Sequence, residues 1–449
     1  MDQVHGAGFE NDPYLAAFGL NVDQTMETTS ARVLDTPEVQ YKNVSERPYM
    51  GAWNMRDKEF VDGATIEHWG VVVEGGVNMG RSQIDNFLRH DRRGASLEEL
   101  MHECFREIER KSGAPPKLIM VIKRDASVGS YAEIKRVSDT VLGIPSQCIV
   151  SKNVPKASPQ YCANVCLKVN MKLSGKNSVL RDPIPLISEV PTIVIGADVE
   201  HPRSGIGNRP SIASVVASLD RYSAKYVGRV AAQKGNDIQK LPGMLRDLFL
   251  AYYQHTGRKP ERVLYYRDGV SEGQFYDILQ AEMKHLRRAC LMMEDNYLPP
   301  VTFVVTNKRH HVRGFSEQNL DRSGNLQPGT IIDTGVVDPH RFDFFLYGHS
   351  GIQGTSCPAH YTVLHDENGL TSNDIQKLTY QLCYTYQRCT RSVSVVPPVY
   401  YAHLAAARAR FYLNEGSDGA STIGSYNSNS SNFEFADLHK NMLNCMFFV

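Results

Sequence analysis

The sequence predicts an α/β protein built from two successive units. Three observations support this prediction. β-branched runs alternate with helical patterns from residue 64 to about residue 175, a proline-rich join follows at 181–185, and three strand-like runs then open a second series. Alternating strands and helices are typical of α/β folds. With 449 residues, the chain is also longer than one hydrophobic core usually organises, so at least two domains are expected.

The first unit, placed at residues 61–182, follows the order β, α, β, α, β, α. Pro115-Pro116 stops its first helix and Gly143 ends the second. This alternation predicts a Rossmann-like parallel sheet. Residues 1–60 are expected to be a linker segment that precedes the unit. The expected elements are strands at 64–73, 117–123 and 146–150 and helices at 97–111, 130–142 and 159–173.

The second unit, placed at residues 183–449, opens with three consecutive strands that suggest an antiparallel meander. A meander followed by α, β, α, β is the order of an RNase H-like fold, in which the first and fourth strands are neighbours. The Ser-, Gly- and Asn-rich stretch 415–432 is expected to be a mobile loop. The expected elements are strands at 192–197, 212–219, 226–231, 262–266 and 301–306 and helices at 242–255, 273–292, 373–390 and 402–413.

The charge of the chain is balanced overall but unevenly distributed. Residues 1–116 hold 12 Lys and Arg against 20 Asp and Glu, net −8, whereas residues 117–185 hold 11 against 4, net +7. The remainder holds 26 against 25, net +1. A short basic stretch of this kind indicates a phosphate-bearing partner. The alternative is a solvated surface of lysine side chains.

Composition excludes several classes of protein. Hydrophobic content of 42% and charged content of 22% are ordinary for a globular protein. No apolar run reaches the length of a membrane span, and the first residues lack the basic and apolar regions of a signal peptide. We therefore expect a cytoplasmic protein with no membrane partner, whose nine cysteines are reduced.

Two aspartates follow strand-like runs, Asp198 after 193–197 and Asp268 after 263–267, and His403 lies at the start of the late helix. A charged group beside a buried strand is costly unless it is paired or metal-bound. In the predicted fold the two aspartates become neighbours, with Asp198 suited to bridge two metal ions. Oxygen-rich ligands favour Mg²⁺ or Mn²⁺, and two such ions promote phosphodiester hydrolysis. The alternative is a pair of solvated strand ends.

The basic stretch contains two helical pairs that could bind one anion together. Tyr131 and Lys135 are four residues apart on one helix, and Lys168 and Lys172 are four apart on another, so each pair shares a face. Gln147, on the strand between them, adds an amide. The alternative for each residue alone is a surface lysine or a half-buried core tyrosine.

The second unit offers further basic groups. Arg408, on the late helix, is expected to reach the phosphate pocket from this unit. Lys308 and Arg309 directly follow a strand, and His349 opens a Gly-rich loop, so all three are candidate contacts for a nucleic-acid backbone. The alternative is that these are solvated loop charges.

Several segments carry a resemblance to a known family, the eukaryotic Argonautes. Those of the second unit resemble the PIWI domain and those of the first unit resemble the MID domain, which points to a MID-PIWI lobe of a fungal silencing Argonaute. The PIWI-like segments are Gly196-Ala197-Asp198-Val199-Glu200-His201-Pro202, Tyr266-Arg267-Asp268-Gly269-Val270-Ser271-Glu272-Gly273-Gln274-Phe275, Gly351-Ile352-Gln353-Gly354-Thr355-Ser356 and Tyr400-Tyr401-Ala402-His403-Leu404. The MID-like ones are Tyr131-Ala132-Glu133-Ile134-Lys135-Arg136-Val137 and Gln147-Cys148.

The resemblance implies a function for both units. MID would anchor the 5′ phosphate of a small guide RNA, and PIWI would cut complementary target RNA with Mg²⁺ or Mn²⁺ held by Asp198, Asp268 and His403. Silencing effector proteins would be partners of a monomeric protein. The implied 5′-phosphate pocket consists of Tyr131, Lys135, Gln147, Cys148, Lys168, Lys172 and Arg408.

The sequence departs from the family pattern at two places. Where cleaving members carry a glutamate in the loop after the third strand, this chain has Asn236, with Asp237 beside it as a candidate substitute. Cys357 stands where relatives often have a basic residue. The first departure leaves open a non-cleaving scaffold that binds guide RNA and recruits partners. An unguided nuclease is a third class, but it would have no use for a phosphate pocket.

Overall fold

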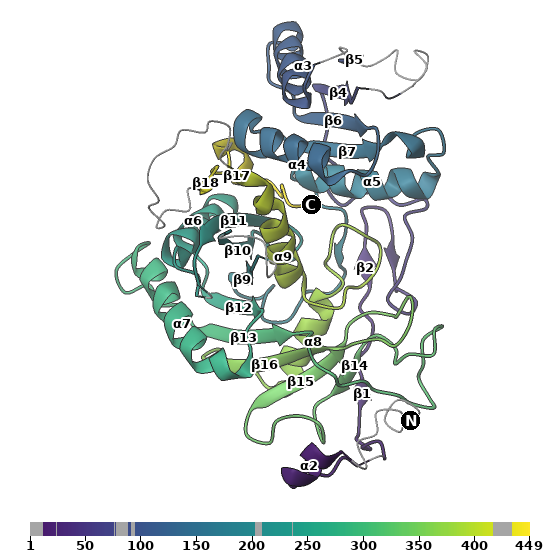
Figure 1. Ribbon diagram of the computed structural model, residues 1–449, viewed down its shortest axis with the longest axis vertical. Coiled ribbons are helices and arrows are strands. Elements are labelled where there is room, and N and C mark those ends of the chain that lie inside the picture. Colours follow the sequence, from purple (N-terminus) through teal and green to yellow (C-terminus); the bar gives the residue numbers. More distant parts are fainter. Residues whose placement is uncertain are drawn as a thin grey trace.

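The computed structural model describes residues 12–23, 25–75, 77, 89–90, 95–202, 209–235, 237–415 and 433–449. The predicted mobile loop lies outside these residues apart from residue 415, and so does Asn236. Figure 1 shows the two units one above the other, with the carboxyl terminus between them. Within the described ranges, no helix combines the length and the apolar character that a membrane crossing requires.

The first unit contains a four-stranded sheet in the order β5-β4-β6-β7, and all three pairings are parallel. The predicted Rossmann-like architecture is therefore confirmed (Figure 1). Helix α3 begins at a capping box between Ser96 and Glu99 and ends at Gly113 in the left-handed conformation. The elements are β4 (Trp69–Val73), β5 (Arg89–His90), α3 (Leu97–Ser112), β6 (Leu118–Lys123), α4 (Val128–Arg136), β7 (Ser146–Val150) and α5 (Pro159–Lys172).

The helix expected at 130–142 changes character partway along. Helix α4 gives way to a π-helix at Val137–Leu142, in which the N–H of Gly143 donates to the carbonyl of Ser138, five residues back. Short π-helical turns occur often at functional sites. Here the turn carries Asp139, which is buried and faces the second unit.

The second unit contains a nine-stranded sheet in the order β1-β14-β15-β16-β13-β12-β9-β10-β11 (Figure 1). Strands β9, β10 and β11 form the predicted antiparallel meander, and β12 pairs in parallel with β9. The first and fourth strands are neighbours, as expected for an RNase H-like fold. The strands are β9 (Thr192–Glu200), β10 (Ser211–Ser218), β11 (Tyr226–Gln233), β12 (Arg262–Asp268), β13 (Val301–Asn307), β14 (Thr330–Ile332), β15 (Phe342–Tyr347) and β16 (Ala359–Asp366).

The amino-terminal segment contributes to the second unit. Strand β1 (Arg32–Val33) pairs with β14 at the edge of the large sheet, and β2 (Val39–Gln40) pairs with β3 (Ser45–Glu46) and β8 (Val179–Leu180). Val39 and Tyr41 are buried in the same cluster as residues of β9, β12 and the last helix. The segment thus wraps along the second unit.

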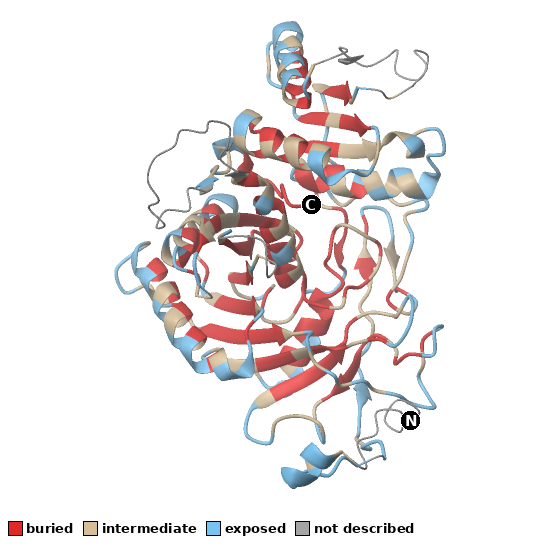
Figure 2. Ribbon diagram, in the orientation of Figure 1, coloured by how far each residue is buried: buried red, intermediate tan, exposed pale blue. Residues whose placement is uncertain are grey.

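Helices cover both faces of the large sheet, whose central strands are buried (Figure 2). The helix expected at 373–390 ends at Leu382, after which the backbone N–H groups of Tyr384 and Thr385 donate to carbonyls three residues back instead of four. The helices are α6 (Leu241–Thr256), α7 (Phe275–Leu291), α8 (Ser372–Leu382) and α9 (Pro397–Ala409), with the short helix α2 (Pro13–Ala17) near the amino terminus and a small β17 (Leu413–Glu415)–β18 (Phe433–Phe435) pair near the carboxyl terminus.

Two expectations about the carboxylate site are corrected. Strand β9 continues to Glu200 because it pairs with β10 as far as Ile212, so Asp198 lies within the strand rather than after it. Helix α9 begins at Pro397, five residues before the expected start, since proline is well accepted in the first turn of a helix. His403 is therefore in the middle of α9.

Gly196 sets how closely α9 approaches β9. A Cβ atom at this position would lie 2.1 Å from the backbone carbonyl of Pro398, a contact with no room to relax. We expect Gly196→Ala to destabilise the protein by about 1–3 kcal/mol, as overpacking typically does. Urea unfolding measures this change. Gly243→Ala, at a position with no atom within 4 Å of the added Cβ, is the matched control.

Candidate phosphate pocket and carboxylate site

A cavity of about 360 Å³ lies at the junction of the two units. All seven residues predicted for the phosphate pocket line it, although they come from α4, β7, α5 and α9. The other lining residues were not predicted from the sequence. Among these, Arg410 could have been found, because it is two residues from Arg408 on the chain. Arg388 could not have been found in this way, because no sequence spacing relates it to α5. The complete lining is Tyr131, Lys135, Gln147, Cys148, Lys168, Lys172, Arg388, Leu404, Ala407, Arg408, Arg410, Phe411, Phe448 and Val449.

Two buried lysines form the wall contributed by the first unit. The ammonium of Lys135 donates to the carbonyl oxygen of Ser146 at 2.7 Å and to its hydroxyl at 2.8 Å. The ammonium of Lys172 donates to Oε1 of Gln147 at 2.7 Å, while Nε2 of Gln147 donates to the carbonyl of Cys148. An ammonium carries three N–H donors, so each lysine keeps at least one for a ligand.

Arg408 brings the second unit into the cavity. Its Nη1 donates to Asp139 Oδ2 at 2.9 Å and to the carbonyl of Phe447 at 2.8 Å, and its Nη2 donates to the Tyr131 hydroxyl at 3.1 Å. The hydroxyl of Tyr412 donates to the same carboxylate oxygen at 2.8 Å. A buried aspartate of the first unit thus fixes an arginine of the second.

The electrostatics of the cavity favour an anion. In the described part of the chain, six lining side chains are basic and none is acidic. Burial, and then the positive charge of Lys135, hold the pKa of Lys172 well below its ordinary value. Burial, and then Arg388, lower the pKa of Lys168. Among described residues, the buried Nε of Arg388 has no hydrogen-bond partner. A phosphate would offset the repulsion among these positive charges and accept hydrogen bonds from donors that lack a partner.

The carboxylate site combines the ends of β9 and β12 with the middle of α9. Asp198 is buried, and its Oδ2 lies 3.3 Å from Nδ1 of His403. Burial, and then the charge of Asp198, raise the pKa of Asp268 to about 6. The hydrogen bond that His403 donates to Asp198 raises the pKa of His403. The structure therefore brings the three predicted residues into one site.

The donor set of this site fits a hard divalent cation. Two carboxylates that repel each other, the buried Asp198 and the partly buried Asp268, are stabilised by a positive ion between them, and oxygen ligands suit Mg²⁺ or Mn²⁺. The described residues contain no group of three His, Cys, Asp or Glu side chains already placed to hold a metal. His403 faces Asp198 through Nδ1, so Nε2 is the ring nitrogen that could bind a metal ion while this contact is kept.

Asp237 makes its described contacts within its own loop. Its backbone carbonyl accepts a hydrogen bond from Nε2 of Gln233 at 2.7 Å, and its carboxylate lies beside Gly235 within the loop that follows β11. No hydrogen bond or ion pair links it to Asp198, Asp268 or His403 in the described part of the molecule.

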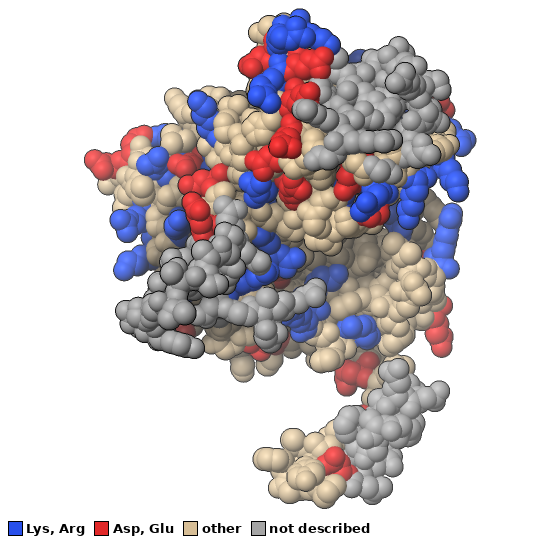
Figure 3. Space-filling model, turned by 45° about the horizontal axis from the view of Figure 1, so that its top comes forward, with Lys and Arg blue, Asp and Glu red and all other residues tan. Residues whose placement is uncertain are grey.

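The predicted RNA-backbone residues differ in their surroundings. The ammonium of Lys308 donates to the Ser394 hydroxyl at 2.7 Å, whereas Arg309 is exposed. Burial, and then Lys308, lower the pKa of His349 to about 4, so this imidazole is neutral at pH 7 and offers no charge to a phosphate. Cys357 lies 3.9 Å from Nε2 of His310. Lys and Arg side chains also gather around a hollow on the face seen in Figure 3.

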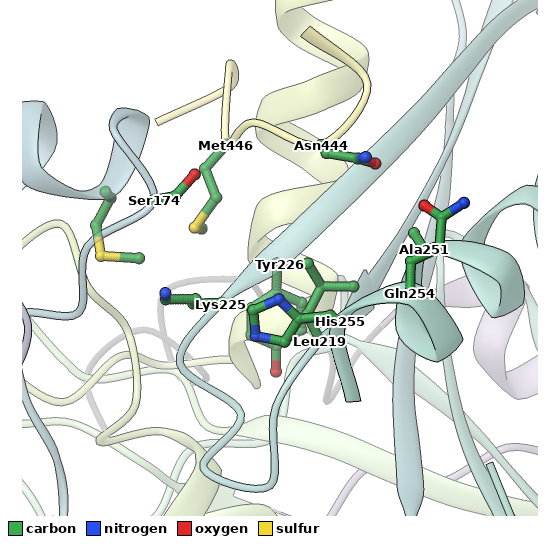
Figure 4. A pocket seen from close by; sticks show the side chains of 10 residues that line it. Ser174, Leu219, Lys225, Tyr226, Ala251, Gln254, His255, Asn444 and Met446 are labelled. Atoms are coloured by element: carbon green, nitrogen blue, oxygen red, sulfur yellow. The ribbon is translucent and has the colours of Figure 1, made fainter. Parts of the chain in front are cut away.

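A second cavity, of about 290 Å³, lies nearby and contains none of the predicted site residues. It is lined by Met171 and Met446, which lie one residue from Lys172 and two residues from Phe448 of the first cavity. Figure 4 shows Ser174 and Lys225 on one side of it and Gln254 and Asn444 on the other.

Comparison with known families gives three matches along the chain. Residues 118–414 match the Piwi domain, residues 47–97 the Mid domain of argonaute, and residues 1–41 the Argonaute linker 2 domain. The Piwi match begins in the first unit, at β6, and contains all the predicted site residues.

Individual proteins are similar over most of this chain. Protein argonaute 10 of Arabidopsis thaliana is 44% identical over 91% of this chain and 47% of its own length, and protein argonaute PNH1 of Oryza sativa subsp. japonica is 42% identical over 92% and 47%. The chain thus spans about half the length of these curated relatives.

Solved structures are similar in fold. The Kluyveromyces polysporus Argonaute with a guide RNA has a TM-score of 0.80 at 26% identity, covering 93% of this chain and 53% of that one. The C-terminal lobe of a budding yeast Argonaute has the same TM-score and identity, covering 93% and 95%.

Proposed function

Because the chain belongs to the Argonaute family, we propose that it binds the 5′ phosphate of a small guide RNA and uses that guide to silence complementary RNA. The observation that carries this proposal is the cavity at the junction of the units, where the seven predicted residues converge and the basic side chains outnumber the acidic ones six to none among the described residues. The geometry suits a terminal phosphate, which can accept several hydrogen bonds at once.

Replacing Lys135 tests the phosphate pocket. We expect Lys135→Ala to weaken binding of a 5′-phosphorylated RNA by about 1.5–3 kcal/mol, the usual value of a hydrogen bond to a charged group. Fluorescence anisotropy with 5′-phosphorylated and 5′-hydroxyl versions of one RNA measures the effect. The 5′-hydroxyl RNA should bind the variant and the unchanged protein alike.

Lys117→Ala is the matched control, because Lys117 pairs with Glu67 at an exposed position of the same unit. An unchanged preference for the phosphorylated RNA in Lys135→Ala would contradict the assignment of the pocket. An equal loss for both RNAs would instead indicate damage to the fold.

We further propose that the protein cleaves the target RNA in the presence of Mg²⁺ or Mn²⁺. Two such ions would activate the attacking water and stabilise the leaving oxygen. Asp198 and Asp268 would bind the ions through carboxylate oxygens, and His403 would add a ring nitrogen. The closeness of these three side chains supports this step.

The second candidate is a guide-binding scaffold that recruits silencing effector proteins without cutting. Asn236 at the glutamate position favours it, as do the contacts of Asp237 with residues of its own loop. The two candidates differ in one measurement: cleavage of a complementary RNA by the guide-loaded protein with Mg²⁺ but not with EDTA supports the nuclease.

We also propose a cytoplasmic, monomeric protein of fungal source. The motif resemblance and the similar yeast structures support the fungal source, whereas the two curated relatives are plant proteins. Light scattering of the purified protein measures the oligomeric state.

A further inference from the structure

A chain of buried polar side chains lies behind the wall of the phosphate cavity. Ser138 and Asp139 are on the π-helix that follows α4, and Ser146 begins β7; each of the three is at most 2% exposed. None of them is among the described residues that line the cavity. The sequence contains a signal for two of them, because Ser138 and Asp139 follow Lys135 by three and four residues, the spacings of one helical face.

Three hydrogen bonds connect Lys135 to Asp139 through two hydroxyl groups. The ammonium of Lys135 donates to Oγ of Ser146 at 2.8 Å. Oγ of Ser146 lies 2.9 Å from Oγ of Ser138, which in turn donates to Oδ1 of Asp139 at 3.2 Å. The other acceptor near Oγ of Ser138, the carbonyl of Lys135, is farther away at 3.4 Å. An ammonium only donates and a carboxylate only accepts, so the two hydroxyl protons point from the lysine toward the aspartate. Hydrogen bonds that follow one direction polarise and strengthen one another.

The same carboxylate holds the arginine that the second unit contributes to the cavity. Oδ2 of Asp139 accepts from Arg408 at 2.9 Å, while Oδ1 accepts from Ser138. Nζ of Lys135 and the guanidinium of Arg408 lie 5.6 and 5.8 Å from the centre of the Tyr131 ring. One buried carboxylate is therefore linked to a cation of each unit, to Arg408 directly and to Lys135 through the two hydroxyls.

The position of Asp139 suits a cavity that must attract an anion. Six basic side chains line the cavity, and their positive charges repel one another. A carboxylate among the lining residues would offset that repulsion, but it would also repel a phosphate. Because Asp139 lies behind the wall, its charge stabilises the cations without facing the ligand. Groups that are held in place before a ligand arrives bind it more tightly, since less ordering is required on binding.

We propose that Ser138 and Ser146 are positioning residues of the phosphate pocket, whose hydroxyl groups link Lys135 to the carboxylate that holds Arg408. This inference rests on the proposed binding of a 5′ phosphate. The hydroxyl chain fixes the ammonium of Lys135 relative to the guanidinium of Arg408, so that both cations meet the same phosphate. Removal of either hydroxyl then weakens recognition of the phosphate although the charge of the pocket is unchanged.

The test compares 5′-phosphorylated and 5′-hydroxyl versions of one RNA, bound to the whole chain and measured by fluorescence anisotropy. We expect Ser138→Ala and Ser146→Ala each to weaken binding of the phosphorylated RNA by about three- to tenfold, the usual effect of one lost hydrogen bond. Binding of the 5′-hydroxyl RNA should stay the same. Thr140→Val is the matched control, because the Thr140 hydroxyl is on the same π-helix but donates to the carbonyl of Arg136 at 2.7 Å.

A double substitution distinguishes positioning from a separate contribution of the hydroxyls. In the Lys135→Ala background, Ser146→Ala should weaken binding of the phosphorylated RNA no further, because the hydroxyl acts through the missing ammonium. Losses that multiply would show that the hydroxyl acts independently of Lys135 and would overturn the inference. Circular dichroism verifies that each variant folds, and if Ser138→Ala does not, Ser146→Ala alone decides the outcome.

The remaining outcomes separate the inference from the function on which it rests. If Lys135→Ala loses the preference for phosphorylated RNA while both serine variants keep it in full, the serines are not positioning residues and the phosphate pocket stands. An equal loss for both RNAs in the serine variants would assign the hydroxyls a structural role only. If the unchanged protein does not distinguish the two RNAs, the inference fails together with the proposed function.

Discussion

Replacement of Asp198 by asparagine is expected to abolish target cleavage, with a loss of at least about a thousandfold. The substitution keeps the shape of the side chain but removes the charge of the buried carboxylate of the pair. Metal ions supply several kcal/mol of transition-state stabilisation, and each 1.4 kcal/mol corresponds to a tenfold change in rate. Single-turnover cleavage of a complementary RNA by the guide-loaded protein measures the loss.

Guide binding should survive this substitution, because none of the hydrogen bonds of the phosphate cavity involves Asp198. Asp295→Asn, on the exposed segment after α7, is the control for an acidic substitution away from the site. If cleavage by Asp198→Asn equals that of the unchanged protein, the metal site has been assigned to the wrong residues. If neither protein cleaves, the scaffold function is supported.

Removal of the Glu282 side chain is expected to lower the free energy of unfolding by about 3–5 kcal/mol. Glu282, on α7, is fully buried; its Oε1 accepts from Nε of Arg267 at 2.9 Å and its Oε2 accepts from the Tyr265 hydroxyl at 2.9 Å. Glu282→Ala leaves the Arg267 charge buried without its carboxylate. Urea unfolding followed by circular dichroism measures the change.

An exposed ion pair supplies the matched comparison for Glu282. Glu261→Ala removes the partner of Arg258 at the surface, where such pairs contribute about 0–1 kcal/mol. A cost for Glu282→Ala as small as that of Glu261→Ala would contradict a buried, charged pair. Since Arg267 immediately precedes Asp268, we also expect slower cleavage in Glu282→Ala.

The sequence was sufficient for the features that depend on local periodicity. The four-residue spacings of Tyr131 with Lys135 and of Lys168 with Lys172 place each pair on one helical face, and the structure directs both faces into one cavity. The meander order predicted that Asp198 and Asp268 would be neighbours, and β9 pairs with β12 accordingly.

Features that depend on contacts between distant residues could not be read in this way. Strand β1 pairs with β14, which lies about 300 residues away along the chain, and local sequence patterns do not predict such pairings. Likewise, Arg388 reaches the cavity because Gln387 hydrogen-bonds to the backbone of Asn177 and Ser178 in the first unit. The end of β9 at Glu200 was set by its pairing with β10 rather than by its own residues.

The hydrogen bond from Arg408 to Asp139 connects the two units and so affects how a ligand leaves the cavity. The cavity is lined by residues of both units, so it exists only while the two units remain in contact. A ligand bound there contacts both units and holds them together. Separation of the units and escape of the ligand then become one event. The lifetime of the bound guide would be set by how often the two units separate. Substitutions far from the phosphate that weaken the contact between the units would shorten that lifetime.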